Sequence, residues 1–275
     1  MTTRPRPLVE LAAGVHVATS AVYATTSSLV VGDDGTTLVV DPGVTAGEVA
    51  GLGAAVARRG WRPVAVWSTH AHWDHVLDGH GVRGLPRWRA GELGSFGPGW
   101  AESLTRSRDD DAALAAVLAA HPQDGPADVV AVPPVPYPRA AGTDRLDWPG
   151  PEVVVVAHAA HAPDHGALVV VHAGVLLCGD MLSDREVPLL DDTAADPVGD
   201  YRAGLDALAS AVERFDLAAV VPGHGSPGDH DELDRRLDAD RAYLDDLVAG
   251  RSDDPRLADP WVADAHAAQV AALHR

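Results

Sequence analysis

Residues 69–75, THAHWDH, place three histidines and one aspartate within seven positions, and this cluster constrains the fold more than any other feature of the sequence. It continues the apolar run PVAVWST (residues 63–69), which predicts a buried strand. Side chains two residues apart at a strand end point to the same side, so His70 and His72 can bind one ion together. A helix starting immediately afterwards would turn Asp74 and His75 towards another side of the same pocket. Four such side chains do not all reach one ion, so the pattern indicates two metal ions.

The rest of the chain alternates strand-like and helix-like segments. The run VVGDDGTTLVV (residues 30–40) predicts a hairpin around a Gly-Asp-Asp-Gly turn. We expect a helix at about Thr45–Arg59, ended by Gly60. Residues 81–150 mix glycine and proline with one helical stretch, and the remaining elements are expected as strands at 152–158, 167–174, 175–180 and 217–225, a helix at 200–215, and helices after residue 228. Strands with interposed helices predict a layered α/β architecture.

The composition excludes several classes of function. The formal net charge of −19 argues against a nucleic-acid-binding surface and against adhesion to anionic membranes. No apolar run approaches the length of a membrane span, and the N-terminus lacks the continuous apolar core of a signal peptide. The single cysteine, Cys178, rules out an intramolecular disulfide. We therefore expect a cytoplasmic protein that binds neither nucleic acid nor membrane.

Five motifs in the same order resemble those of one known family. HAHWDH fits the H-x-H-x-D-H signature of the metallo-β-lactamase superfamily, and LVVDPG, HAPDH, LLCGD and VPGHG resemble its other characteristic segments. The resemblance extends from Asp41 to His224. It implies an α/β fold, the αββα four-layer sandwich of the metallo-β-lactamase type, with the metal site at one edge of the sheets. Residues 1–275 would form a single domain, with an irregular or helical insertion at about 81–150 and a helical C-terminal segment at about 228–275.

The resemblance also implies a set of seven metal ligands. One ion would be bound by His70, His72 and His161, the other by Asp74, His75 and His224, with Asp180 bridging the two. Asp74 and Asp180 would also serve catalysis.

Two further assignments carry an alternative. HAPDH has Asp164 where the family has glycine, and this departure leaves His165 as the alternative to His161. Asp41 would orient a ligand imidazole, as carboxylates beside metal sites do, or would simply be a turn residue before Pro42.

A set of seven histidine and aspartate ligands leaves positions open for water and substrate, which indicates a catalytic rather than a structural site. We expect two Zn²⁺ ions, with iron or manganese as alternatives, and a zinc-dependent metallo-hydrolase of the glyoxalase II-like or lactonase-like branch. A metal-bridging hydroxide would cleave an ester, thioester or lactone bond of a small molecule. The alternatives are a β-lactam hydrolase and an iron-dependent oxygenase or redox member of the same superfamily.

The sequence says less about the substrate pocket. We expect its walls from Leu85–Arg139 and from the loop after Asp180, with Trp73 and Arg185 as candidate wall residues. Packing explains Trp73 equally well, and a solvated surface charge explains Arg185 equally well. The role of His80 and the oligomeric state stay open.

Overall fold

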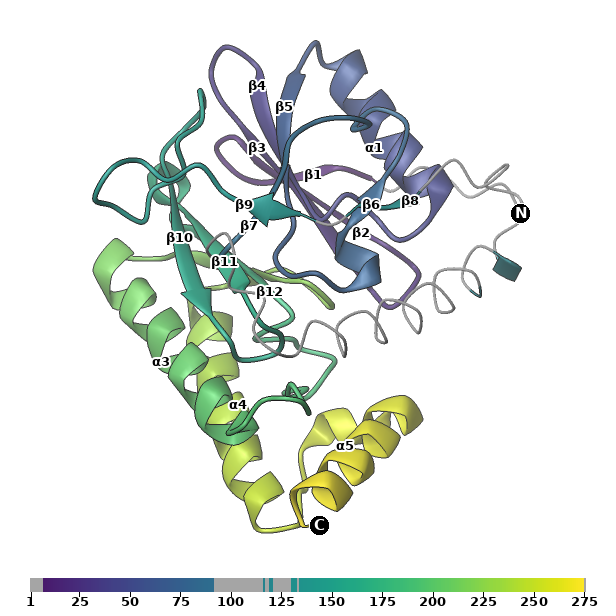
Figure 1. The fold of residues 1–275 in the computed structure, drawn as a ribbon, viewed down its shortest axis with the longest axis vertical. Helices are drawn as coiled ribbons and strands as arrows, with labels where there is room; N and C mark the ends of the chain where they lie inside the picture. Colours follow the sequence, from purple (N-terminus) through teal and green to yellow (C-terminus); the bar gives the residue numbers. More distant parts are fainter. Residues whose placement is uncertain (1–6, 92–115, 117–118, 121–129, 133, 275) are drawn as a thin grey trace.

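The structure is a computed structural model that describes residues 7–91, 116, 119–120, 130–132 and 134–274. A first sheet of seven strands has the order β1-β2-β3-β4-β5-β7-β9, and a second of five strands has the order β10-β11-β12-β13-β14 (Figure 1). The first sheet contains β1 (Val9–Ala12), β2 (Val15–Thr19), β3 (Thr26–Val31), β4 (Thr36–Val40), β5 (Arg62–Trp67), β7 (Arg87–Arg89) and β9 (Val135–Pro136). The second contains β10 (Val153–His158), β11 (His165–Val170), β12 (Val175–Gly179), β13 (Ala219–Pro222) and β14 (Gly228–Asp229).

The remaining elements are helices and one small strand pair. β6 (Leu77–Asp78) pairs with β8 (Val130–Ala131). In the part of the chain that the structure describes, the helices with defined bounds are α1 (Ala46–Arg58), α3 (Pro197–Phe215), α4 (His230–Val248) and α5 (Pro260–Leu273), and the short 3₁₀ turns are η1 (Trp73–His75), η3 (Val171–Ala173) and η4 (Pro255–Ala258). Among the described residues, no helix is both long and apolar enough to cross a membrane.

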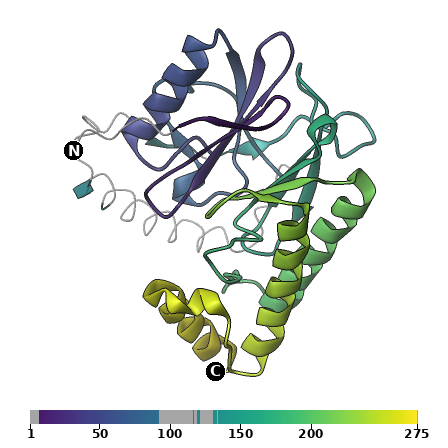
Figure 2. The ribbon, with the colours of Figure 1, turned by 180° about the vertical axis from the view of Figure 1, so that it is seen from behind.

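Side-chain alternation along the strands builds four layers. In β3, Leu29 and Val31 pack in a cluster with the apolar face of α1, whereas Val30 packs in the cluster between the two sheets. In β11, Val169 packs in the cluster that contains α3 and α4, and Val170 points to the other sheet. Each sheet therefore has a helical outer layer, as Figures 1 and 2 show, and the prediction of an αββα sandwich is confirmed.

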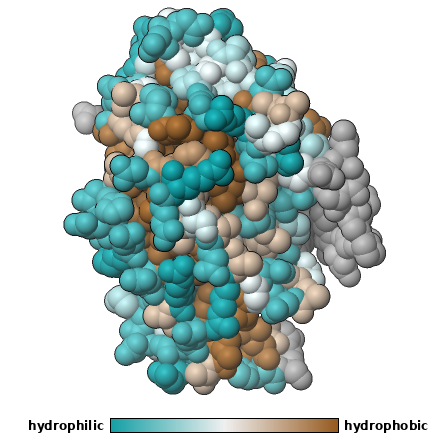
Figure 3. Space-filling view, turned by 90° about the vertical axis from the view of Figure 1, so that its left-hand side faces the viewer, coloured by the Kyte–Doolittle hydropathy of each residue, from teal (hydrophilic) through white to brown (hydrophobic). Residues whose placement is uncertain are grey.

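Helix α3 has one apolar face. The residues that α3 buries against the second sheet are Tyr201, Gly204, Leu205, Leu208, Ala211 and Val212. Its other positions are largely charged or small, and Figure 3 shows mainly hydrophilic residues, with smaller hydrophobic patches, on that side of the molecule. This pattern is that of a helix lying on a sheet surface.

Most predicted elements are found where the sequence places them. The hairpin expected at 30–40 is β3–β4, and the helix expected at Thr45–Arg59 is α1, with Thr45 as its N-cap and Gly60 in the left-handed conformation after its end. In its described part, the stretch at 81–150, expected to be irregular or helical, includes β7 and β9 at the edge of the first sheet. The helical stretch expected within this segment, DDDAALAAVLAAH at residues 109–121, falls largely outside the described residues.

The loops at one end of both sheets come together. Parallel strands β4 and β5 end there in the first sheet, and parallel strands β12 and β13 end there in the second. Backbone hydrogen bonds join the sheets at this end, among them those from Thr26 to the carbonyl of Gly223 at 2.7 Å and from Gly166 to that of Thr69 at 2.7 Å. The carboxyl ends of parallel strands are where α/β proteins gather their functional loops.

Candidate metal centre

Every candidate ligand lies in a loop at this end of the sheets. The signature histidines follow β5, which ends at Trp67, so His70 and His72 are in the loop after the strand rather than in the strand itself. The turn η1 then carries Asp74 and His75. The other three candidate ligands lie in distant segments. His161 is in the β10–β11 loop, Asp180 directly follows β12, and His224 is in the loop after β13.

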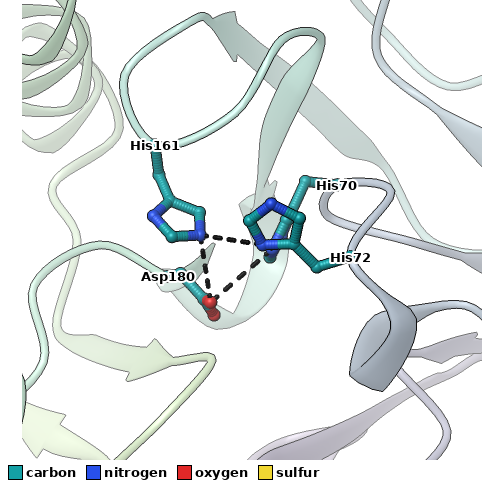
Figure 4. A group of neighbouring side chains, drawn as sticks. All are labelled: His70, His72, His161 and Asp180. Carbon is teal, nitrogen blue, oxygen red and sulfur yellow. Dashed lines mark hydrogen bonds and ion pairs between the residues drawn. The ribbon is translucent and has the colours of Figure 1, made fainter. Parts of the chain in front are cut away.

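Four of these side chains form a first group, drawn in Figure 4. Nδ1 of His72 lies 2.9 Å from Nε2 of His70 and 3.1 Å from Nε2 of His161. Oδ2 of Asp180 lies 3.6 Å from Nε2 of His70 and 3.4 Å from Nε2 of His161. Two nitrogens that bind one zinc ion tetrahedrally are roughly 3.3 Å apart, given bonds of about 2.0–2.1 Å. The spacing of this group therefore fits a single divalent cation.

Asp74, His75 and His224 form a second group. Oδ2 of Asp74 lies 3.7 Å from Nε2 of His75 and 3.2 Å from Nε2 of His224. Asp180 reaches this group too, with Oδ1 at 3.2 Å from Nε2 of His75 and Oδ2 at 3.4 Å from Nε2 of His224. Its carboxylate therefore stands between the two groups.

In four of the five histidines the ring nitrogen that faces away from the group has a polar partner. Because these partners lie close to Nδ1, they favour a proton there and leave Nε2 free to face the group. The pairs are His70 with the Thr69 hydroxyl at 3.1 Å, His75 with the Asp41 carboxylate at 2.9 Å, His161 with the Leu189 carbonyl at 2.8 Å, and His224 with the Tyr23 carbonyl at 3.0 Å.

Burial and nearby charges give four of these side chains the protonation state that binds a metal. Burial, together with neighbouring histidines, lowers the pKa of His70 well below its usual value and that of His72 to about 3, so both are neutral. Burial raises the pKa of Asp74 and Asp180, but the nearby histidines outweigh it. They bring the pKa of Asp74 to about 2 and that of Asp180 well below its usual value, so both are ionised.

The two imidazoles of the second group, His75 and His224, have a different protonation state. Burial lowers the pKa of His75 and of His224, but the surrounding carboxylates, Asp180 first, outweigh burial and raise both well above the usual value. Without a cation these rings therefore carry protons. Nε2 of His75 and Oδ1 of Asp180 are buried and face each other as an ion pair at 3.2 Å, yet neither has a hydrogen bond of proper geometry within the described part of the chain. A divalent cation would replace the protons and satisfy both atoms, so the residues fit a metal.

The other predicted residues lie around the centre. One carboxylate oxygen of Asp41 accepts a hydrogen bond from the His75 ring, and both oxygens accept hydrogen bonds from Thr69. Asp41 is therefore placed to orient His75. His165 belongs to neither group: its ring stacks on that of His70, with centroids 5.0 Å apart, and both of its ring nitrogens are buried with no hydrogen-bond partner among the described residues. The geometry therefore favours His161 over His165 as the ligand.

Four further residues named from the sequence lie outside both groups. Trp73 is 9% exposed and packs in the cluster beneath α1, whereas Arg185 is exposed. His80 is exposed as well. Cys178 is fully buried in the cluster under α3 and α4, with Sγ 3.0 Å from the Met181 carbonyl, as expected of a packing residue.

Sequence reasoning missed three residues that line the centre. Leu189 and Tyr23 act through backbone carbonyls, which no side-chain motif reveals. Tyr23 and Ala24 also hold φ angles of 54° and 49°, a left-handed pair that turns the Tyr23 carbonyl to His224. Glu186 lies 3.8 Å from Nδ1 of His224, and burial raises the pKa of its carboxyl to about 7.

Known proteins share this fold. The metallo-beta-lactamase superfamily matches residues 22–224 of the chain. No curated protein matches the chain significantly. A metallo-beta-lactamase family protein from Thermus thermophilus is 19% identical, with a TM-score of 0.64 over 96% of this chain and 93% of its own.

Two further solved structures are similar over nearly their whole length. The metallo beta lactamase from Hirschia baltica is 15% identical, with a TM-score of 0.53 over 88% of this chain and 98% of its own. VMB-1 is also 15% identical, with a TM-score of 0.52 over 88% of this chain and 99% of its own. At these identities the likeness shows the fold alone.

Proposed function

The chain belongs to the metallo-β-lactamase superfamily, and from that membership we propose that it is a hydrolase that holds two divalent cations and cleaves an acyl bond of a small molecule. The proposed bonds are esters, thioesters and lactones. The proposal places the protein in the cytoplasm, which suits a chain whose single cysteine is buried and unpaired.

The position of Asp180 carries the proposal. Its Oδ1 faces His75 at 3.2 Å, and its Oδ2 faces His161 at 3.4 Å and His224 at 3.4 Å. One carboxylate thus belongs to both groups, an arrangement that suits two neighbouring cations rather than one. The complete set of imidazole and carboxylate donors suits zinc, with iron and manganese as the alternatives.

Two cations bound here would lower the pKa of a shared water molecule and polarise the substrate carbonyl. The chain's own residues prepare this chemistry. The ionised carboxylates of Asp74 and Asp180 supply negative charge to the centre, while the neutral rings of His70 and His72 present unprotonated nitrogens. The protons on His75 and His224 leave when cations bind, and Asp41 keeps the Nδ1 proton of His75 in place.

The reaction class is tested with metal-free protein to which zinc, manganese or iron is returned. Each form is assayed against esters, thioesters, lactones and β-lactams at neutral pH. We expect zinc-dependent hydrolysis of at least one of the first three classes. His224→Ala should lose that activity, whereas the matched control His230→Ala should keep it, because His230 is 53% exposed and lies outside both groups.

Two results would contradict the proposal. Hydrolysis confined to β-lactams would assign the chain to the other hydrolytic class of the family. An oxygen-consuming reaction that requires iron, with no hydrolysis in the zinc form, would show redox chemistry instead.

A further inference from the structure

The backbone carbonyl of Leu189 determines how His161 meets the first group. It accepts a hydrogen bond from Nδ1 of His161 at 2.8 Å. Nδ1 therefore carries the proton, and Nε2 is free to face His72 at 3.1 Å and Asp180 at 3.4 Å. If the carbonyl pointed elsewhere, the ring would lose the contact that selects its tautomer and its orientation.

Residues 187–190 form neither a helix nor a strand, so no regular ladder fixes the Leu189 carbonyl. One side chain of α5 brackets it instead. The backbone N–H of Leu190 donates to Oε1 of Gln269 at 2.8 Å, and Nε2 of Gln269 donates to the Pro188 carbonyl at 3.0 Å. The Gln269 amide thus holds the residue before Leu189 and the residue after it.

Gln269 also contacts α4, although its amide orientation is set by the two bonds to residues 188–190. Its Nε2 also donates to the Tyr243 hydroxyl at 3.1 Å, and that hydroxyl lies 3.0 Å from Nδ1 of His266. Tyr243 is only 1% exposed. Because the amide uses its acceptor once and its donors twice, a flipped amide would lose its bonds to Pro188 and Leu190 together.

A second anchor from the C-terminal part of the chain holds the beginning of the same segment. Nη1 of Arg256 donates to the carbonyls of Ser183 at 3.1 Å and Glu186 at 2.9 Å, and to the buried carboxylate of Asp240 at 2.7 Å. Residues 183–190 are thus held at both ends by residues that follow α4.

The position of α5 agrees with such a role. Figures 1 and 2 show it at the far end of the molecule, beside the C-terminal half of α4. Val262 is the only residue that is buried along this fully described helix. The helix therefore adds little to the core, yet Gln269 reaches the loop that orients a candidate ligand.

We propose that Gln269 is a positioning residue for His161: by bracketing Leu189 it aims the carbonyl that orients the imidazole, and so links the C-terminal helix to cation binding by the first group. This inference rests on the proposed function, because it assigns the first group a cation.

The test compares Gln269→Leu with the matched control Tyr243→Phe. The first change keeps the approximate volume of the side chain and removes both bonds to residues 188–190. The second removes a buried hydroxyl from the same contact but leaves those two bonds in place. Nitrogen NMR of the imidazoles in the metal-free protein reports the tautomer of His161, and competitive titration with a chromophoric chelator measures the affinity of each zinc ion.

We expect both tautomers of His161 to be populated in Gln269→Leu. The affinity for one zinc ion should fall about tenfold, at the lower end of the effect of removing a ligand's hydrogen-bond partner. The other zinc ion should keep its affinity. Tyr243→Phe should lower the melting temperature and leave both zinc affinities unchanged. In a His161→Ala background, Gln269→Leu should have no further effect on zinc binding, because the two residues act through one contact.

An unchanged His161 tautomer in Gln269→Leu would overturn the inference. So would an affinity for both zinc ions that falls by the same factor in Gln269→Leu and in Tyr243→Phe. A wild-type protein that binds neither zinc, iron nor manganese would refute the proposed function, while the metal-free NMR comparison would still test whether Gln269 positions His161.

Discussion

Replacing Asp41 with alanine probes how the fold prepares the metal centre without touching a candidate ligand. Asp41 is 2% exposed, and its carboxylate accepts three hydrogen bonds. They come from the Thr69 backbone at 3.0 Å, the Thr69 hydroxyl at 2.8 Å and Nδ1 of His75 at 2.9 Å. Asp41→Ala leaves the backbone N–H of Thr69 and the Nδ1–H of His75 buried without an acceptor.

The expected loss of stability follows from these two donors. Each buried donor left without an acceptor costs roughly 1–3 kcal/mol, so the pair costs roughly 2–6 kcal/mol. Alanine at this site also adopts a left-handed backbone, since φ of Asp41 is 46°, which adds about 1 kcal/mol. The zinc ion of the second group should bind roughly 10–100-fold more weakly, because His75 loses the carboxylate that orients it.

Asp41→Asn separates the two effects. Asparagine tolerates the left-handed backbone and its oxygen can still accept from the Thr69 backbone, but no acceptor is left for His75. We therefore expect a smaller loss of stability, about 1–3 kcal/mol, with the same loss of zinc affinity. Urea denaturation of the metal-free protein and competitive zinc titration measure the two quantities. A change below about 1 kcal/mol in Asp41→Ala, with zinc affinity within twofold of wild type, would refute the reasoning.

Three further predictions concern the same centre. Asp180→Ala should lower the hydrolysis rate by more than about a hundredfold and should reduce the metal content, because both groups lose a shared ligand; full activity in this variant would exclude a bridging role. Gly179→Ala should destabilise the metal-free protein by roughly 1–3 kcal/mol in thermal denaturation, because a Cβ there would lie 2.6 Å from the His165 ring, at a φ of 57°; an unchanged melting temperature would contradict this. Zinc binding should release protons, since the pKa values of His75 and His224 are raised, so affinity should fall as the pH is lowered; calorimetry in buffers of different ionisation enthalpy would detect the protons, and a buffer-independent heat would argue against their release.

The elements that could be predicted are those with a strong local pattern. The hairpin β3–β4 has a four-residue turn between β-branched runs, and α1 has a threonine cap at one end and a glycine at the other. The short strands β7 (RWR) and β9 (VP) carry no such pattern. They become strands because β7 pairs with β5 and β9 pairs with β7 at the edge of the sheet. This pairing is a property of the tertiary fold.

The candidate site divides in the same way. Its ligand-type side chains could be predicted because they recur at characteristic spacings in a known family. Of the groups that orient them, only Asp41 could be predicted. Thr69 adjoins its histidine but belongs to no motif, and the others act across long sequence separations. Leu189 contacts a ring 28 residues away, Tyr23 contacts one 201 residues away, and Gln269 reaches Leu190 across 79 residues.

The central claim is that the fold assembles one two-cation centre from loops of both sheets. Quantifying metals in the purified protein by elemental analysis, after removal of loosely bound ions, tests it most directly. We predict about two zinc ions per chain, falling to about one or fewer in Asp180→Ala. One iron ion and no zinc in the wild-type protein would contradict this claim.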